Sequence, residues 1–147
     1  MTVPPRDHAP ERRTALALEP ALDSPSRARH FAGTMLESWG LGALRPRVEL
    51  LVSELVRNAV EHAGTTCTLT LVEAHGCLRI EVADASTVLP QRRRPSPMDL
   101  TGRGLVVVES VADNWGAEPD PGGKVVFCEL DVPSVPSRLE PSTEGAG

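Results

Sequence analysis

Aromatic residues are scarce in this chain of 147 residues, which has two Phe, two Trp and no Tyr. Proteins that bind single-stranded nucleic acid stack the bases on aromatic side chains, so a site of that kind is not expected here. The formal net charge of -5 also argues against a nucleic-acid backbone as the main partner, because such proteins usually carry a basic surplus. The net charge does not exclude the binding of a small anionic ligand at a local basic site.

Long apolar runs are missing as well, and none reaches the length that spans a membrane. The opening residues MTVPPRDHAPERR hold charge and proline where a signal peptide needs an apolar segment. The three cysteines, Cys67, Cys77 and Cys128, are odd in number and lack the close spacing of metal ligands. We therefore expect a cytoplasmic protein with no membrane partner and no complete disulfide framework.

The chain length fits one domain of ordinary size. Residues 1–11 and 133–147 are rich in Pro, Ser, Glu and Gly and lack periodicity, which is typical of mobile tails. The expected folded unit is residues 12–132.

Apolar periodicity within residues 12–132 predicts alternating strands and helices. RRTALALEP predicts a first strand, and DSPSRARHFAGTMLESWG a helix that ends at Gly40. TCTLTLVEA and CLRIEVAD alternate like two strands of a hairpin that turns at His75 and Gly76. A third helix follows GRG, and residues 114–119 and KVVFCELDV predict the last two strands.

The second predicted helix, residues 47–63, is the most clearly patterned element. Its apolar positions form one broad stripe before Gly64 ends it, namely Val48, Leu51, Val52, Leu55, Val56, Ala59, Val60 and Ala63. At about 100° per residue, Glu54, Asn58 and Glu61 fall in a narrow sector at the edge of that stripe. Such a polar cluster can face a cleft while the helix stays packed.

Glu54 and Asn58 suit phosphoryl-transfer chemistry. Mg²⁺ prefers hard oxygen ligands and keeps phosphate oxygens and waters as the others, so the Asn58 carbonyl can hold one position beside a nucleotide. Glu54, one turn away, can orient or deprotonate an attacking hydroxyl. The alternative is a solvated helix face, because residues four apart are frequent neighbours on helix surfaces.

Asp84 ends the strand in RIEVADAS. A carboxylate beside an apolar floor can accept a hydrogen bond from the exocyclic amine of adenine, whereas guanine presents an acceptor at that position. Asp at a strand end is also a routine turn former, and this alternative stays open.

Gly102, Arg103 and Gly104 precede the third predicted helix. Backbone amides and the positive end of the helix dipole can meet phosphate there, with the Arg103 guanidinium as a further donor. A tight glycine loop is the alternative, and the Lys and Ser or Thr of a Walker motif are absent. The arginines at 92–94 can help to draw phosphate in, but a solvated loop face explains them better.

Together these segments resemble the GHKL ATPases. ELVRNAVEHA is similar to the N box of that family, VADAS to the aspartate box that follows it, and GRGL to the glycine box. The boxes come in the family order, separated by 26 and 18 positions. The brief loop between Asp84 and Gly102, and the DSPSRARHFA segment of the first helix, resemble the anti-sigma-factor serine/threonine kinase branch and its actinobacterial relatives.

The resemblance implies an α+β fold of the Bergerat type. It is a two-layer α/β sandwich whose mixed, mostly antiparallel sheet carries helices on one face. ATP and Mg²⁺ are the implied cofactors. By motif match, Glu54 is the catalytic base, Asn58 the magnesium ligand and Asp84 the adenine reader. The phosphate loop is Gly102, Arg103 and Gly104 with the adjoining Leu105, and Arg29 engages a protein partner.

One position departs from the family pattern. The family usually has glycine two positions after the aspartate, and this chain has Ser86, whose side chain can either narrow the expected adenine pocket or replace a water in it.

Two functions follow from the resemblance. In the first, the protein transfers the ATP γ-phosphate to Ser or Thr of an antagonist protein and, when free, sequesters a sigma factor, either as a monomer or as a homodimer. In the alternative, it is a nucleotide-dependent binding module without phosphotransfer.

Overall fold

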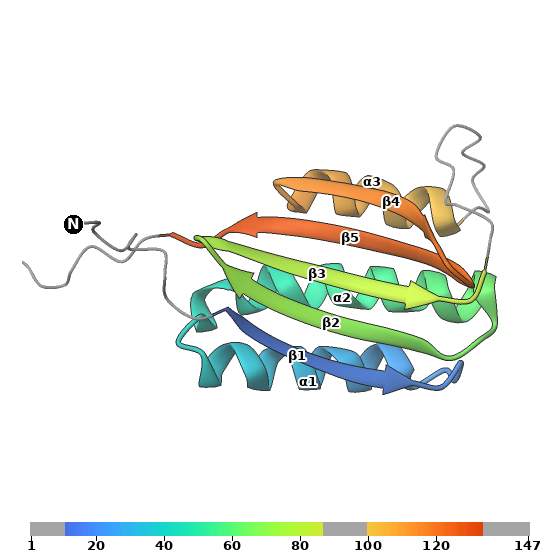
Figure 1. The fold of residues 1–147 in the computed structure, drawn as a ribbon, viewed down its shortest axis with the longest axis horizontal. Helices are drawn as coiled ribbons and strands as arrows, with labels where there is room; N and C mark the ends of the chain where they lie inside the picture. The colour runs from blue at the N-terminus through green and yellow to red at the C-terminus, as the bar shows by residue number, and fades with distance from the viewer. Residues whose placement is uncertain (1–10, 87–99, 134–147) are drawn as a thin grey trace, which may run out of the picture.

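One five-stranded sheet and a layer of helices make up the fold (Figure 1). The computed structural model describes residues 11–86 and 100–133, and the side chains of all of these except residues 100–105. The strands are β1 (Arg12–Leu18), β2 (Cys67–Ala74), β3 (Cys77–Asp84), β4 (Asn114–Asp120) and β5 (Gly123–Asp131). The helical segments are α1 (Ser24–Ser38), the 3₁₀ turn η2 (Gly42–Leu44), α2 (Arg45–Asn58), the π-helix η3 (Ala59–Ala63) and α3 (Leu100–Val111).

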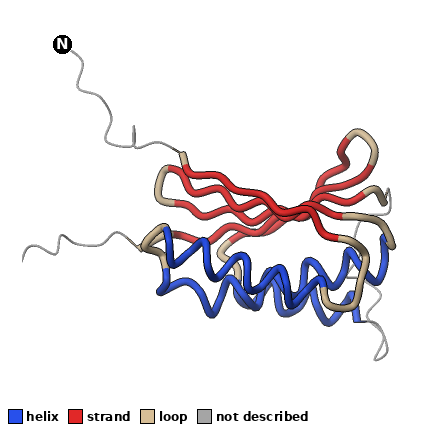
Figure 2. Tube along the Cα trace, turned by 90° about the horizontal axis from the view of Figure 1, so that it is seen from below, coloured by secondary structure: helices blue, strands red, loops and turns tan. Residues whose placement is uncertain are grey.

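The strand order is β1-β2-β3-β5-β4, and every pairing among the described strands is antiparallel. The last strand of the described chain therefore lies inside the sheet, between β3 and β4. Figure 2 shows the three helices together on one side of the sheet. The predicted α+β sandwich with helices on one face is confirmed, and no parallel pair occurs among residues 11–86 and 100–133.

The core lies between the two layers because both carry apolar residues at the period of their structure. In β3, Leu78, Ile80 and Val82 are buried and alternate with less buried residues. The apolar stripe predicted for the second helix is confirmed in α2, where Val48, Leu51, Val52 and Val56 are fully buried. In α1 the fully buried apolar residues are Ala28, Ala32 and Leu36. Aliphatic side chains therefore fill the interior.

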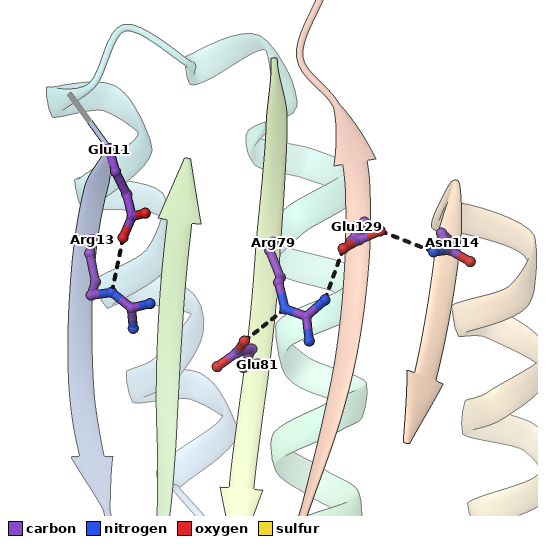
Figure 3. A network of polar contacts seen from close by, with 6 residues as sticks. All are labelled: Glu11, Arg13, Arg79, Glu81, Asn114 and Glu129. Carbon is purple, nitrogen blue, oxygen red and sulfur yellow. Dashed lines mark hydrogen bonds and ion pairs between the residues drawn. The ribbon is translucent and has the colours of Figure 1, made fainter. Parts of the chain in front are cut away.

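The opposite face of the sheet carries charges rather than a second layer. Arg79 donates to Glu81 at 2.7 Å and to Glu129 at 2.9 Å, and its guanidinium lies 3.9 Å from the centroid of the Phe127 ring (Figure 3). Asn114 also donates to Glu129, and the hydrogen bonds from Asn114 and Arg79 lower the pKa of that carboxyl. These contacts bind β3, β5 and β4 to one another across the solvent-facing surface.

Turns and boundaries agree largely with the sequence patterns. The hairpin between β2 and β3 turns at His75 and Gly76, both with positive φ. The helical segment after Arg45 ends at Gly64, which is left-handed as expected of a helix stop. Most of the two predicted tails lies outside the described residues. No described helix is long and apolar enough to cross a bilayer.

Gly123 lets β5 begin directly against the end of β3. A Cβ built on Gly123 would overlap the backbone oxygen of Asp84 and lie 2.8 Å from the Cα of Ala85. Both neighbours are backbone atoms, one of the last residue of β3 and one of the residue that follows it, and neither can swing away as a side chain can. This position therefore tolerates no side chain without displacing one strand.

Gly123→Ala should lower the free energy of unfolding by about 1–3 kcal/mol, the usual range for overpacking. Gly42→Ala is the matched control, because its Cβ would meet only the carboxylate end of Glu37, an exposed and flexible side chain. Urea denaturation of the two variants measures the difference. Equal stability of Gly123→Ala and the wild type would show that the two strand ends are not closely packed.

Candidate functional site

Glu54 lies on α2 at the border of the buried stripe. Its side chain is only 11% exposed, and Arg57 donates to its Oε1 at 2.9 Å from one turn further along the helix. Within the described part of the chain no other residue donates to Oε2, so one carboxylate oxygen is left for another donor. A buried carboxylate that keeps one oxygen open can accept a proton from a bound hydroxyl.

Asn58 is the last residue of α2, and the π-helix η3 follows it immediately. Single turns of π-helix inside α-helices are frequent at functional sites. The Asn58 side chain is half-buried and makes no hydrogen bond to any other residue in the described part of the chain. Its amide oxygen is thus available to a ligand, which fits the donor chemistry that Mg²⁺ prefers.

The end of this helical segment lies beside the end of β3. η3 contacts β3, and the Thr65 hydroxyl, just past Gly64, accepts a hydrogen bond from the backbone N–H of Ala85 at 3.3 Å. Figure 1 shows the ends of α2 and β3 at the same end of the molecule. The fold therefore brings the N-box segment and the aspartate box to one end of the two layers.

Asp84 is engaged by a residue that the sequence patterns did not single out. Lys124 Nζ donates to Asp84 Oδ1 at 3.0 Å and to Oδ2 at 2.8 Å, and the Ser86 backbone N–H donates to Oδ1 at 2.8 Å. The side chains of Asp84 and Lys124 are 2% and 7% exposed. The predicted adenine reader is thus one half of a buried ion pair at the helix-covered end of the sheet.

Cys67 adjoins this pair on the neighbouring strand. Burial, together with the smaller effect of the negative charge of Asp84, raises the pKa of its thiol to about 11. The thiol is therefore neutral near pH 7 and adds no charge to the site. The negative charge of the Asp84 carboxylate is balanced by Lys124 alone among these close neighbours.

Arg29 is placed near α2 by a single contact. Its Nη1 donates to the Ser53 hydroxyl at 2.9 Å, next to Glu54 in the chain. The side chain is half-buried, so the predicted partner residue and the predicted base lie on adjacent parts of two packed helices.

The glycine box is where a predicted boundary is wrong. Gly102, Arg103, Gly104 and Leu105 lie within α3, which already begins at Leu100 rather than after the glycines. The N–H groups of the first three residues of a helix have no intrahelical acceptor, so the Gly102 N–H is among the free donors, and Arg103 is the first residue past them. Glycine is tolerated in such a terminal turn, which explains why it did not mark the helix start.

A separate hollow of 610 Å³ lies between β1 and α1. It is lined by Leu16, Ser26, Arg27, His30, Phe31, Thr34 and Met35. None of the predicted site residues lines it, and it is distant in the sheet order from β3 and β5. This hollow is therefore not the nucleotide site predicted from the motifs.

Sequence reasoning missed Lys124 and Arg57. Lys124 is the only lysine in the chain, and all other Lys or Arg positions are arginine. This exception was the signal in the sequence that could have singled it out. Arg57 carried no signal beyond its position between Glu54 and Asn58. Contacts between side chains 40 residues apart are set by the sheet order, which local periodicity does not reveal.

The Asp84–Lys124 pair should couple strongly in stability. Lys124→Met should lower the free energy of unfolding by about 3–5 kcal/mol, because it leaves a buried carboxylate without its counter-charge. Adding Asp84→Asn to Lys124→Met should lose less than the sum of the single effects. Urea denaturation of the four proteins measures this, and purely additive effects would contradict it.

Arg13→Met is the control for that measurement. The ion pair between Arg13 and Glu11 is longer, at 3.3 Å, and the Arg13 side chain is 58% exposed. Loss of such an exposed pair should change stability by only about 0–1 kcal/mol.

Comparison with known proteins agrees with this architecture. Residues 18–128 match a family model described as the histidine kinase-like ATPase domain. A crystal structure of the RsbU and RsbW domains of Rv1364c from Mycobacterium tuberculosis is similar to the chain, with a TM-score of 0.63 and 18% sequence identity. The similarity covers 82% of this chain and 32% of that chain, and at this identity it shows the fold. A search of curated proteins finds no match. Because the family model spans more than half of the sequence, the chain belongs to the histidine kinase-like ATPase domain family.

Proposed function

We propose that this chain binds ATP with Mg²⁺ and transfers the γ-phosphate to a Ser or Thr hydroxyl of an antagonist protein. The observation that carries the proposal is the polar edge of α2, where a buried Glu54 with one open oxygen lies one turn from a half-buried, unengaged Asn58. Family membership supports nucleotide binding in general. The RsbW domain of the similar structure supports the regulatory setting.

The residues fit the implied cofactors chemically. The Asn58 amide oxygen would hold Mg²⁺, which supplies charge neutralisation at the phosphates when bound. Asp84 would accept from the adenine amine. The N–H groups at the start of α3 that have no intrahelical acceptor, which end with that of Gly102, would receive phosphate oxygens, with Arg103, Gly104 and Leu105 in the same segment.

Glu54 would act on the hydroxyl of the protein substrate. The hydroxyl oxygen forms a bond to the γ-phosphorus as the bond from that phosphorus to the β–γ bridging oxygen breaks, and ADP leaves. The hydroxyl proton passes to the open Oε2 of Glu54, while Arg57 holds Oε1 and fixes the carboxylate. Most of the catalysis in such transfers comes from positioning and charge stabilisation around the phosphates.

The partners follow from the same resemblance. We propose that the free protein holds a sigma factor in the cytoplasm, and that Arg29, beside Ser53 on α2, takes part in engaging a protein partner. Phosphorylation of the antagonist would then control which partner is held.

Glu54→Gln should lower the phosphorylation rate by about 10²–10⁴-fold, the usual contribution of a general base, and leave ATP affinity unchanged. The amide keeps the size of the side chain and can still accept from Arg57. The assay incubates the protein with γ-labelled ATP and proteins co-purified from its native host. Full-speed transfer by this variant would exclude Glu54 as the base.

Asn58→Ala is the matched comparison on the same helix. It removes a metal ligand rather than a base, so it should lose Mg²⁺-dependent nucleotide binding as well as turnover. Calorimetry with and without Mg²⁺ separates the two effects. A wild-type protein that binds ATP and a partner yet transfers no phosphate would instead be the nucleotide-dependent binding module.

Ser86→Gly should tighten ATP binding. The backbone N–H of Ser86 donates to Asp84 Oδ1 at 2.8 Å, so glycine keeps that hydrogen bond and removes side-chain bulk from the expected pocket. Ser86→Ala distinguishes the hydroxyl from the Cβ, because it removes the hydroxyl alone. Unchanged or weaker affinity of Ser86→Gly, measured by calorimetry, would show that the pocket is adapted to serine.

A further inference from the structure

Lys124 occupies an unusual position for the only lysine of the chain. It is the second residue of β5, directly after Gly123, and its side chain is 7% exposed. Lysine is almost never this deeply buried unless it is paired. Its position is fixed from two directions, since Gly123 packs on the backbone of Asp84 while Nζ reaches both carboxylate oxygens of that residue.

The hydrogen bonds of this pair are incomplete on both sides. An ionised carboxylate offers about four acceptor positions, and the described donors to Asp84 fill three of them, leaving one on Oδ2. A lysine ammonium has three N–H donors. Two of them point at Asp84, and no other described side chain or backbone group accepts the third.

An acceptor position and a donor therefore remain beside each other, both buried. A buried polar hydrogen without a partner is unfavourable, so the pair is suited to a ligand that supplies a donor and an acceptor on adjacent atoms. The Watson–Crick edge of adenine has this order, with the exocyclic amine as donor and the ring nitrogen N1 as acceptor. Hypoxanthine and guanine present the reverse, with an exocyclic oxygen and a protonated N1.

We propose that Lys124 is a second base-reading residue, which donates to N1 of adenine while Asp84 accepts from the exocyclic amine. The proposal rests on the adenine nucleotide site proposed above. Discrimination between adenine and bases with the opposite order of donor and acceptor, such as hypoxanthine, then depends on both Asp84 and Lys124. It also gives a role to the third N–H of the Lys124 ammonium, which no described group accepts.

The first test uses the unmodified protein. Calorimetry with Mg²⁺ compares ATP with 1-deaza-ATP, in which a C–H replaces N1, and with ITP, which reverses the edge. A hydrogen bond from a charged donor predicts that 1-deaza-ATP binds about 10- to 100-fold more weakly than ATP. ITP should bind more weakly still, because it turns an acceptor toward the Asp84 carboxylate. Equal affinity for ATP and 1-deaza-ATP would overturn the proposal.

The second test asks whether Lys124 itself reads N1. Lys124→Met should weaken ATP binding to about the level of 1-deaza-ATP and cause no further loss with 1-deaza-ATP. Lys124→Arg, which keeps a charged donor, should retain more of the preference for ATP. If Lys124→Met weakens both nucleotides equally, the lysine is only a counter-ion for Asp84, and the proposal fails. Should Lys124→Met not fold, the comparison of nucleotides on the wild type still decides.

Arg79→Met is the matched control. Arg79 lies on β3 and also pairs with carboxylates, those of Glu81 and Glu129, but it is on the opposite face of the sheet (Figure 3). Its loss should leave the ratio of ATP to 1-deaza-ATP affinity unchanged. The outcomes separate the two proposals: a wild type that binds no ATP removes both, whereas one that binds ATP and 1-deaza-ATP alike removes only the role of Lys124.

Discussion

The buried pair of Asp84 and Lys124 is the contact on which the site end of the molecule depends. It joins the end of β3 to the start of β5 at the helix-covered face, where neither charge has appreciable access to water. Each charge is tolerable there only because of the other, since an isolated ion in a low-dielectric interior is strongly unfavourable. The close approach at Gly123 holds the two strand ends in the register that keeps them paired.

Helix α2 links this end of the sheet to the rest of the core. One side of it supplies the apolar residues that pack on the sheet, and its polar edge carries Glu54, Arg57 and Asn58. The two roles do not compete, because the apolar residues and the polar residues lie on different sides of the helix axis. The change from α- to π-helix comes directly after Asn58, η3 still places Ala59 in the core, and the chain then turns back toward β2.

Much of the architecture could be predicted from local patterns. The apolar stripe of α2, its end at Gly64 and the hairpin at His75 and Gly76 all follow from periodicity and turn chemistry, and the structure confirms them. The π-helix could not be predicted, because its residues continue the helical pattern. The partner of Asp84 could not be found either, since Lys124 is 40 residues away and reaches it only through the pairing of β3 with β5. Roles for Glu54 and Asn58 came from the motif resemblance, and they remain predictions.

The position of β5 between β3 and β4 has a consequence for synthesis on the ribosome. A nascent chain that ends before Gly123 has β1, β2 and β3 but lacks the strand that covers the free side of β3. In that state β3 exposes an unpaired edge, a template for wrong association. Asp84 also lacks its counter-ion until Lys124 has emerged. Because domains generally fold as units during synthesis, the ion pair of Asp84 and Lys124, and with it the proposed nucleotide site, is completed among the last parts of this one.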